Sequence, residues 1–242
     1  MKKFASVISM LLICSMALTA CGSNGGDKST GGSTQQPGTS QGAASSQGAA
    51  SSQGAASTGD SSGYTFRTSA DNKVVTENGT FTKENIEGPV LITSIGQSAD
   101  VSMLDALMKK VGADYTFNAT ASADDVANYK TVIIACGASS KGLGAAGISQ
   151  EDELARANAI AQTVKDNGIT VIAAHLGGAS RRGALSDQFN DIALGVANYV
   201  MVVEEGNDDG KFTDAATDKG VPITLLHSIA DAITPLTELF GA

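Results

Sequence analysis

From about residue 88 onward, continuous apolar runs alternate with segments whose apolar residues recur at helical spacing. Apolar runs of this length are typical of strands that are buried on both faces of a parallel sheet. The helical spacing predicts amphipathic helices that cover such a sheet. The predicted strands are residues 89–95, 115–117, 131–136, 170–174, 199–203 and 222–226, and the predicted helices are residues 99–111, 124–129, 150–167, 186–196, 213–219 and a last one from about 228.

The alternation of strands and helices implies right-handed crossovers between parallel strands. For residues 88–242 we therefore expect an α/β fold, a three-layer sandwich with a mostly parallel sheet of five or six strands. A flavodoxin-like strand order is favoured over the Rossmann order, although the pattern itself does not separate the two. In either order, ligands bind outside the carboxyl ends of the strands, where the following loops gather.

Residues 64–87 form a less regular N-terminal extension. Two short runs of strand-forming residues, 73–76 and 80–82, lie on either side of an Asn-Gly pair at 78–79. Because Asn-Gly favours the tight type I′ turn of β-hairpins, we expect a small hairpin or an edge strand here.

Residues 1–20 are typical of a secretory signal, since two lysines precede an apolar run that is too short for a typical membrane-spanning helix. The run ends in Leu-Thr-Ala-Cys at residues 18–21, which resembles the lipobox of bacterial lipoproteins. The resemblance implies cleavage before Cys21 and lipidation of that cysteine, which would anchor the chain in a lipid bilayer. An ordinary signal peptide followed by a chance cysteine is the alternative.

Residues 21–63 are of low complexity, and Ser-Gln-Gly-Ala-Ala-Ser recurs at residues 40, 46 and 52. Such a segment has almost no apolar residues beyond alanine and cannot form a core. We expect it to be a disordered tether between the lipidated cysteine and the folded domain.

The charge of the folded part excludes some partners. From residue 64 onward there are 13 Lys+Arg against 23 Asp+Glu, a net charge of −10. This balance argues against nucleic acid and against electrostatic binding to anionic lipid. Association with a membrane is therefore expected to come from the lipid on the cysteine.

The three cysteines leave no pair for an intramolecular disulfide. Cys14 leaves with the signal, Cys21 is expected to carry lipid, and Cys136 ends an apolar run. A cysteine in that position is expected to be a buried, inert thiol. A nucleophilic thiol at the end of a strand is the alternative for Cys136.

Glycine-rich loops follow several of the predicted strands and bring three of the 13 cations of the folded part to one edge of the sheet. Glycine lets backbone N–H groups approach an anion, so these loops are suited to a phosphate or a carboxylate. The alternative is that the glycines only make turns and the arginines pair with Asp187, Asp191 or Glu204. Arg181, which is nearer the glycines, is the first choice for the ligand, and Arg182 for an internal pair with Asp187 or an acid of a neighbouring loop. The candidate ligand-binding residues are Gly96, Gln97, Ser98, Ser139, Lys141, His175, Gly177, Gly178, Arg181 and Arg182.

Two further chemistries are open at this edge. If the last three strands are neighbours, His175, Glu204 and His227 could hold a metal ion. The alternative is a histidine that is hydrogen-bonded to a loop carbonyl. A hydrolase would need His175 as its base with Ser139 or Ser94 as its nucleophile. The sequence assigns no cofactor, because no P-loop is present and the glycines at 142–147 lie in the wrong place for a dinucleotide loop.

Taken together, residues 139–147, 181–187 and 204–210 resemble uncharacterised exported bacterial proteins and lipoproteins that carry a domain of unknown function. The resemblance extends from about residue 88 to the C-terminus and implies export and an α/β domain, but no activity. We therefore expect a lipid-anchored protein on the extracytoplasmic face of the cell membrane that binds a small anionic ligand. The alternatives are an enzyme acting on a phosphorylated or carboxylated substrate, and a protein-interaction module.

The anchor leads to a direct prediction. Replacing Cys21 by serine (Cys21→Ser) removes the thiol that would carry lipid, so the protein should be released from membranes or remain unprocessed. Membrane fractionation and the mass of the chain measure both effects. A Cys14→Ser variant is the matched control and should behave as wild type. Normal processing and membrane binding of Cys21→Ser would contradict the lipobox.

Overall fold

The computed structural model describes residues 63–241, so the predicted signal peptide, Cys21 and nearly all of the predicted tether lie outside the described residues. Within residues 63–241, no helix has the length and apolar character needed to cross a membrane.

One sheet of seven strands organises the described residues, in the order β1-β7-β6-β5-β4-β2-β3. Strands β2 to β7 are parallel where they pair, and β1 is antiparallel to β7. The order β3-β2-β4-β5-β6 is the flavodoxin-like one, and β7 continues it. The strands are β1 Val74–Glu77, β2 Val90–Ile95, β3 Thr116–Phe117, β4 Thr131–Cys136, β5 Thr170–His175, β6 Tyr199–Val203 and β7 Ile223–Leu226.

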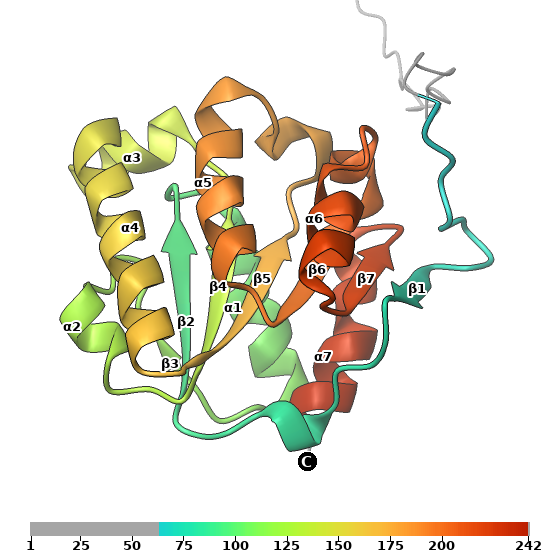
Figure 1. The fold of residues 1–242 in the computed structure, drawn as a ribbon, viewed down its shortest axis with the longest axis horizontal. Helices are drawn as coiled ribbons and strands as arrows, with labels where there is room; N and C mark the ends of the chain where they lie inside the picture. Colours follow the sequence, from blue (N-terminus) through green and yellow to red (C-terminus); the bar gives the residue numbers. More distant parts are fainter. Residues whose placement is uncertain (1–62, 242) are drawn as a thin grey trace, which may run out of the picture. The chain divides into compact units, whose positions relative to one another are not determined.

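Helices pack on both faces of this sheet (Figure 1). Buried residues of α4, α5 and α6 form one core cluster with one face, and buried residues of α1 and α7 form a second cluster with the other. The α-helices are α1 Asp100–Val111, α2 Ala123–Val126, α3 Ser140–Ala146, α4 Gln150–Asp166, α5 Ala184–Val196, α6 Lys211–Lys219 and α7 Ile233–Phe240. Short 3₁₀ turns are η1 Lys83–Asn85, η2 Gly178–Arg181, η3 Glu204–Asn207 and η4 Ile229–Ala232.

The sheet has one strand more than the expected maximum of six, because the N-terminal extension contributes β1. Asn78 and Gly79 have positive φ angles of 61° and 108°, as the predicted tight turn requires. However, residues 80–82 form no strand, and the ring of Phe81 instead stacks on the ring of Tyr199. The extension therefore supplies an edge strand, and the α/β sheet begins at Val74 rather than after residue 88.

The loops that follow β2 and β4 lie in direct contact at the carboxyl edge of the sheet. A Cβ atom at Gly96 would overlap the carbonyl oxygen of Gly137, and one at Gly142 would overlap the carbonyl oxygen of Gln97. Gly96 also has a φ of +95°, which side chains disfavour. These glycines are thus required for close packing of the loops, whatever else they contact.

Candidate functional site

The first loop of the carboxyl edge is held from inside the protein by Glu153 of α4. The carboxylate of this fully buried residue accepts hydrogen bonds from the backbone N–H of Gly96 at 2.8 Å and from Gln97 Nε2 at 3.2 Å. Arg156 balances its charge through Nε and Nη2 at 2.8 and 2.7 Å. Gly96 and Gln97 were predicted to bind a ligand, yet these donors are used within the protein.

Other candidate residues also have local structural partners. Ser98 is buried, and its hydroxyl accepts a hydrogen bond from the backbone of Asp100 at the start of α1. Ser139 caps α3 by accepting a hydrogen bond from the N–H of Gly142 at 3.1 Å. Lys141 lies exposed on α3, a helix that the sequence pattern did not predict.

Arg182 forms an internal ion-pair network, the alternative that the sequence left open for the arginines. Its guanidinium contacts Asp187 at 2.9 Å and Asp209 at 2.7 Å, and donates to the carbonyl of Gly206 at 2.6 Å. Hydrogen bonds to Asp209, and then to Asp187, hold the pKa of Arg182 above its ordinary value. We therefore assign Arg182 to the stability of the loops rather than to a ligand.

Arg181 has a different environment. Its Nε lies 3.6 Å from Oδ2 of Asp100, close enough for an ion pair but too far for a hydrogen bond. Both of these atoms are buried, and neither has a hydrogen-bond partner. A Cβ atom at Gly177 would overlap both Asp100 and Arg181, so the glycine makes room for their contact.

His175 ends β5 and is fully buried. Its Nε2 lies 3.2 Å from the carbonyl oxygen of Gly178, which is the loop-carbonyl alternative considered for this histidine. Burial lowers the pKa of His175, and this effect outweighs the opposing influence of Gly178, Asp100 and Asn190. The imidazole is therefore neutral near pH 7. A carbonyl oxygen can only accept, so the contact with Gly178 favours a proton on Nε2, which leaves the lone pair of Nδ1 on the side of Asn190.

Asn190 of α5 lies beside this histidine. It is fully buried, and its Nδ2 donates to the backbone carbonyl of Arg181 at 3.4 Å and to Asp187 at 3.2 Å. Its Oδ1 and Nδ1 of His175 lack a well-formed hydrogen bond. Asn190 nevertheless interacts with the histidine side chain closely enough to oppose the lowering of its pKa.

Asp100, His175, Arg181 and Asn190 together form what we call the edge cluster. Their Oδ2, Nδ1, Nε and Oδ1 atoms are the only buried side-chain polar atoms without a hydrogen bond among residues 63–241. Leaving a buried polar atom unpaired costs about 1–3 kcal/mol, so such atoms are rare and call for an explanation. The four atoms come from α1, β5, η2 and α5 and lie in two pairs, Asp100 with Arg181 and His175 with Asn190. The edge cluster is therefore the candidate site.

Glu204 is not available for the metal site that the sequence suggested. Both of its oxygens accept hydrogen bonds from the N-terminal extension, from the hydroxyl of Tyr64 at 2.9 Å, from the backbone N–H of Arg67 at 2.8 Å, and from Thr68 at 2.6 and 2.7 Å. His227 is exposed. In the part of the chain that the structure describes, no three His, Cys, Asp or Glu side chains are arranged to hold a metal ion.

The catalytic alternatives also lack their geometry within residues 63–241. Burial raises the pKa of Cys136 to about 12, so its thiol is protonated at neutral pH and inert. The hydroxyl of Ser94 donates to the carbonyl of Ala135, and that of Ser139 caps a helix. Neither serine is hydrogen-bonded to His175, as a nucleophile and its base would be.

Sequence reasoning missed half of the edge cluster. Asn190 and Ser186 lie on the inward stripe of α5 with Phe189 and Ala193, and both polar residues are buried. A polar residue on the inward face of a predicted helix is a signal that could have identified Asn190. Asp100 gave no comparable signal, because an acidic residue in the first turn of a helix is common.

The fold and the edge cluster define an α/β-domain protein with a mostly parallel sheet and polar groups gathered beyond its carboxyl edge. Residues 87–240 match the family described as "Domain of unknown function (DUF6305)", and the chain belongs to that family. No curated protein matches the sequence.

One solved structure with local likeness is a GDSL-like lipase from Bacteroides thetaiotaomicron VPI-5482. It is 12% identical, and the likeness covers 58% of this chain and 72% of the other, with a TM-score of 0.26. A likeness at this level carries no argument about the fold or activity of the present chain.

The contacts of Glu204 predict how stability depends on pH. Burial alone would raise its pKa, but the hydrogen bonds from Thr68, Arg67 and Tyr64 together hold it below the ordinary value of 4.5. The carboxylate therefore contributes stability above pH 4.5, and this contribution is lost as the pH falls through the lowered pKa. Glu204→Gln should cost roughly 2 kcal/mol of unfolding free energy at pH 7, and the difference from wild type should shrink in acid.

Chemical denaturation at several pH values measures this difference. Glu205→Gln, which alters the exposed neighbour on the same turn, is the matched control and should have little effect. Equal stability of Glu204→Gln and wild type at pH 7 would mean that the extension is not held by this carboxylate.

Proposed function

We propose that the protein is a membrane-anchored extracytoplasmic lipoprotein whose α/β domain binds a small anionic ligand at the edge cluster. The observation that supports this most strongly is the gathering of four buried polar atoms without a well-formed hydrogen bond at the carboxyl edge. Support for the anchor comes from the lipobox-like residues 18–21. The helices belong to two separate core clusters, which supports a three-layer arrangement. In that arrangement, ligands bind beyond the carboxyl edge of the sheet.

The charge of the ligand is inferred from Arg181. Its Nε faces the carboxylate of Asp100, whereas Nη1 contacts only a neighbouring exposed carbonyl, that of Ser180, at 3.2 Å. About a quarter of the side chain is exposed. Asp100 thus faces the buried side of the Arg181 guanidinium. The N–H groups on the other side of the guanidinium can donate to a carboxylate or a phosphate.

His175 and Asn190 offer the ligand a different kind of contact. Nδ1 of the neutral imidazole and Oδ1 of the amide both accept hydrogen bonds. Both side chains are fully buried and act on each other, so a ligand hydroxyl or amide N–H would reach them by replacing that contact. We therefore favour a small hydroxy-acid or a phosphorylated hydroxyl compound over a simple inorganic anion.

An enzyme that acts on such a ligand is the second candidate, and its support is the unpaired Nδ1 of His175. That atom could accept a proton from a bound hydroxyl. Turnover that is lost in His175→Gln while ligand binding remains would favour this candidate over a binding protein.

The binding site is tested by removing both charges of its ion pair at once. Asp100→Asn with Arg181→Gln keeps side chains of similar size. Because both charges are removed together, no buried carboxylate is left without a cation. We expect this double variant to bind phosphate and lactate at least about tenfold more weakly than wild type, a change worth roughly 1.4 kcal/mol. The loss of stability should be small, since the two side chains share no hydrogen bond.

Arg182→Gln is the matched control, because it removes the neighbouring arginine. It should lose roughly 2 kcal/mol of stability with the contacts to Asp187 and Asp209, yet keep the affinity of wild type. Isothermal titration and thermal unfolding measure the two effects. The proposal fails if neither anion binds wild type at millimolar concentration, or if the double variant binds as well as wild type.

A further inference from the structure

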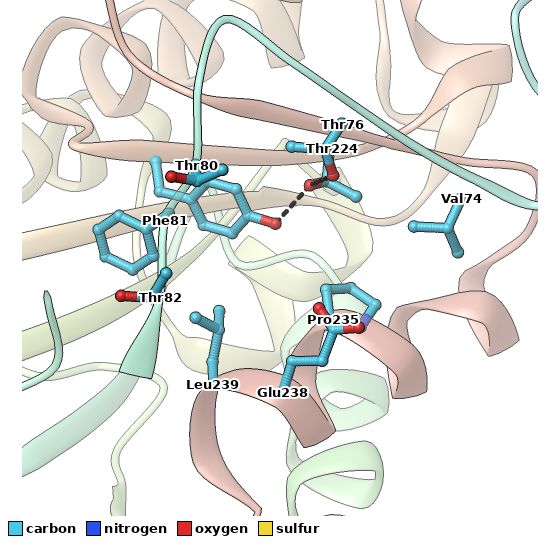
Figure 2. A pocket seen from close by; sticks show the side chains of 10 residues that line it. Val74, Thr76, Thr80, Phe81, Thr82, Thr224, Pro235, Glu238 and Leu239 are labelled. Carbon is cyan, nitrogen blue, oxygen red and sulfur yellow. Dashed lines mark hydrogen bonds between the residues drawn. The ribbon is translucent and has the colours of Figure 1, made fainter. Parts of the chain in front are cut away.

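A pocket lies away from the edge cluster, between the edge of the sheet and α7 (Figure 2). It has a volume of about 250 Å³. Tyr199 opens β6, so this pocket is near the amino end of that strand rather than beyond the carboxyl ends. The lining residues are Val74, Thr76, Thr80, Phe81, Thr82, Tyr199, Thr224, Pro235, Glu238 and Leu239.

A chain of hydroxyl groups forms the polar wall of this pocket. The hydroxyl of Tyr199 donates to Oγ1 of Thr224 at 2.6 Å, and that oxygen lies 2.8 Å from Oγ1 of Thr76. Either threonine hydroxyl can donate across that second contact, and Thr224 is buried whereas Thr76 is exposed. Tyr199 has then given away its only proton, and its oxygen can meet a ligand only as an acceptor.

The opposite wall brings a negative charge. Figure 2 shows Glu238 of α7 beside Pro235, across the pocket from the hydroxyl chain. None of the ten lining residues is a lysine or an arginine. Burial raises the pKa of Tyr199 to about 12, and the nearby charge of Glu238 adds to this effect against the opposing hydrogen bond with Thr224. The phenol is therefore neutral, and the only formal charge of the pocket is that of the carboxylate.

An aromatic surface completes the pocket. The rings of Phe81 and Tyr199 stack with centroids 4.8 Å apart and planes 1° from parallel. Phe81 is half-buried, so part of this aromatic pair faces the pocket and the solvent. The faces of aromatic rings attract cations.

We propose that this pocket binds a small organic cation that carries an ammonium group. Glu238 supplies the opposite charge, the phenolic oxygen of Tyr199 accepts an N–H, and the apolar part of the ligand packs on Phe81 and Leu239. An anion would meet the carboxylate with no lysine or arginine among the ten lining residues to balance it. A neutral polyol could also use the hydroxyl groups, but it would gain nothing from the charge of Glu238.

The test titrates the full chain with ethylammonium, followed by the backbone amide resonances in NMR spectra at constant ionic strength. Ethanol is the neutral probe of the same size. We expect ethylammonium to shift the resonances of Tyr199, Glu238 and Phe81 saturably, and ethanol to leave them in place. Glu238→Gln should weaken the binding at least tenfold, whereas Glu151→Gln, an exposed residue of α4, should leave it unchanged.

Each other outcome overturns the proposal. If Glu238→Gln and Glu151→Gln weakened ethylammonium binding equally, the binding would depend only on the overall negative charge of the protein. If ethanol caused equal shifts, the pocket would bind neutral ligands. The same would follow if glucose, a neutral polyol, caused saturable shifts that did not depend on Glu238. An absence of saturable shifts with ethylammonium would show that the pocket does not bind ammonium groups.

Discussion

Three buried carboxylates hold the segments that meet at the carboxyl edge of the sheet. Glu153 holds the loop after β2, Glu204 holds the N-terminal extension, and Asp100 faces Arg181 of the loop after β5. A buried charge is tolerated only when other groups compensate it, so each carboxylate fixes the backbone that supplies its partners. The positions of the loops therefore depend on these ionic contacts as well as on the packing of the glycines.

The three carboxylates differ in how well they are satisfied. Glu153 and Glu204 each accept several short hydrogen bonds, whereas Oδ2 of Asp100 accepts none. A purely structural ion pair would be expected to reach hydrogen-bonding distance, as the pair of Arg182 and Asp187 does. This contrast separates the groups that maintain the edge from those that we assign to a ligand.

Sequence patterns predicted the fold better than the site. The central parallel strands could be located because they are apolar runs bounded by polar residues, and their burial on both faces agrees with that pattern. Strand β1 was harder to place. Its only apolar residues are Val74 and Val75, and its partner β7 lies about 150 residues further along the chain. The helix α3 was missed because two glycines in it lower its helical propensity.

At the site, the position of the arginines favoured Arg181 for the ligand and Arg182 for an internal pair, and Arg182 does pair with Asp187. The two arginines are adjacent in the chain, and only the fold decides which one meets Asp100 and which one meets Asp187. Likewise, the glycines at 96 and 142 could be noticed in the sequence, but not that they allow the contact between the loops after β2 and β4. Glu204 could be placed at a strand end, yet its partners come from the extension, 136 to 140 residues earlier in the chain.

The most direct test of the edge cluster is the state of His175, observed through the nitrogen resonances of its side chain in NMR spectra during a titration with lactate. The account predicts a neutral imidazole at pH 7 with its proton on Nε2, and a change in the Nδ1 resonance as the hydroxy-acid binds. His227, which is exposed, serves as the reference within the same spectrum. A charged imidazole at pH 7, or an Nδ1 resonance that stays in place while lactate binds, would contradict the assignment of this cluster to the ligand.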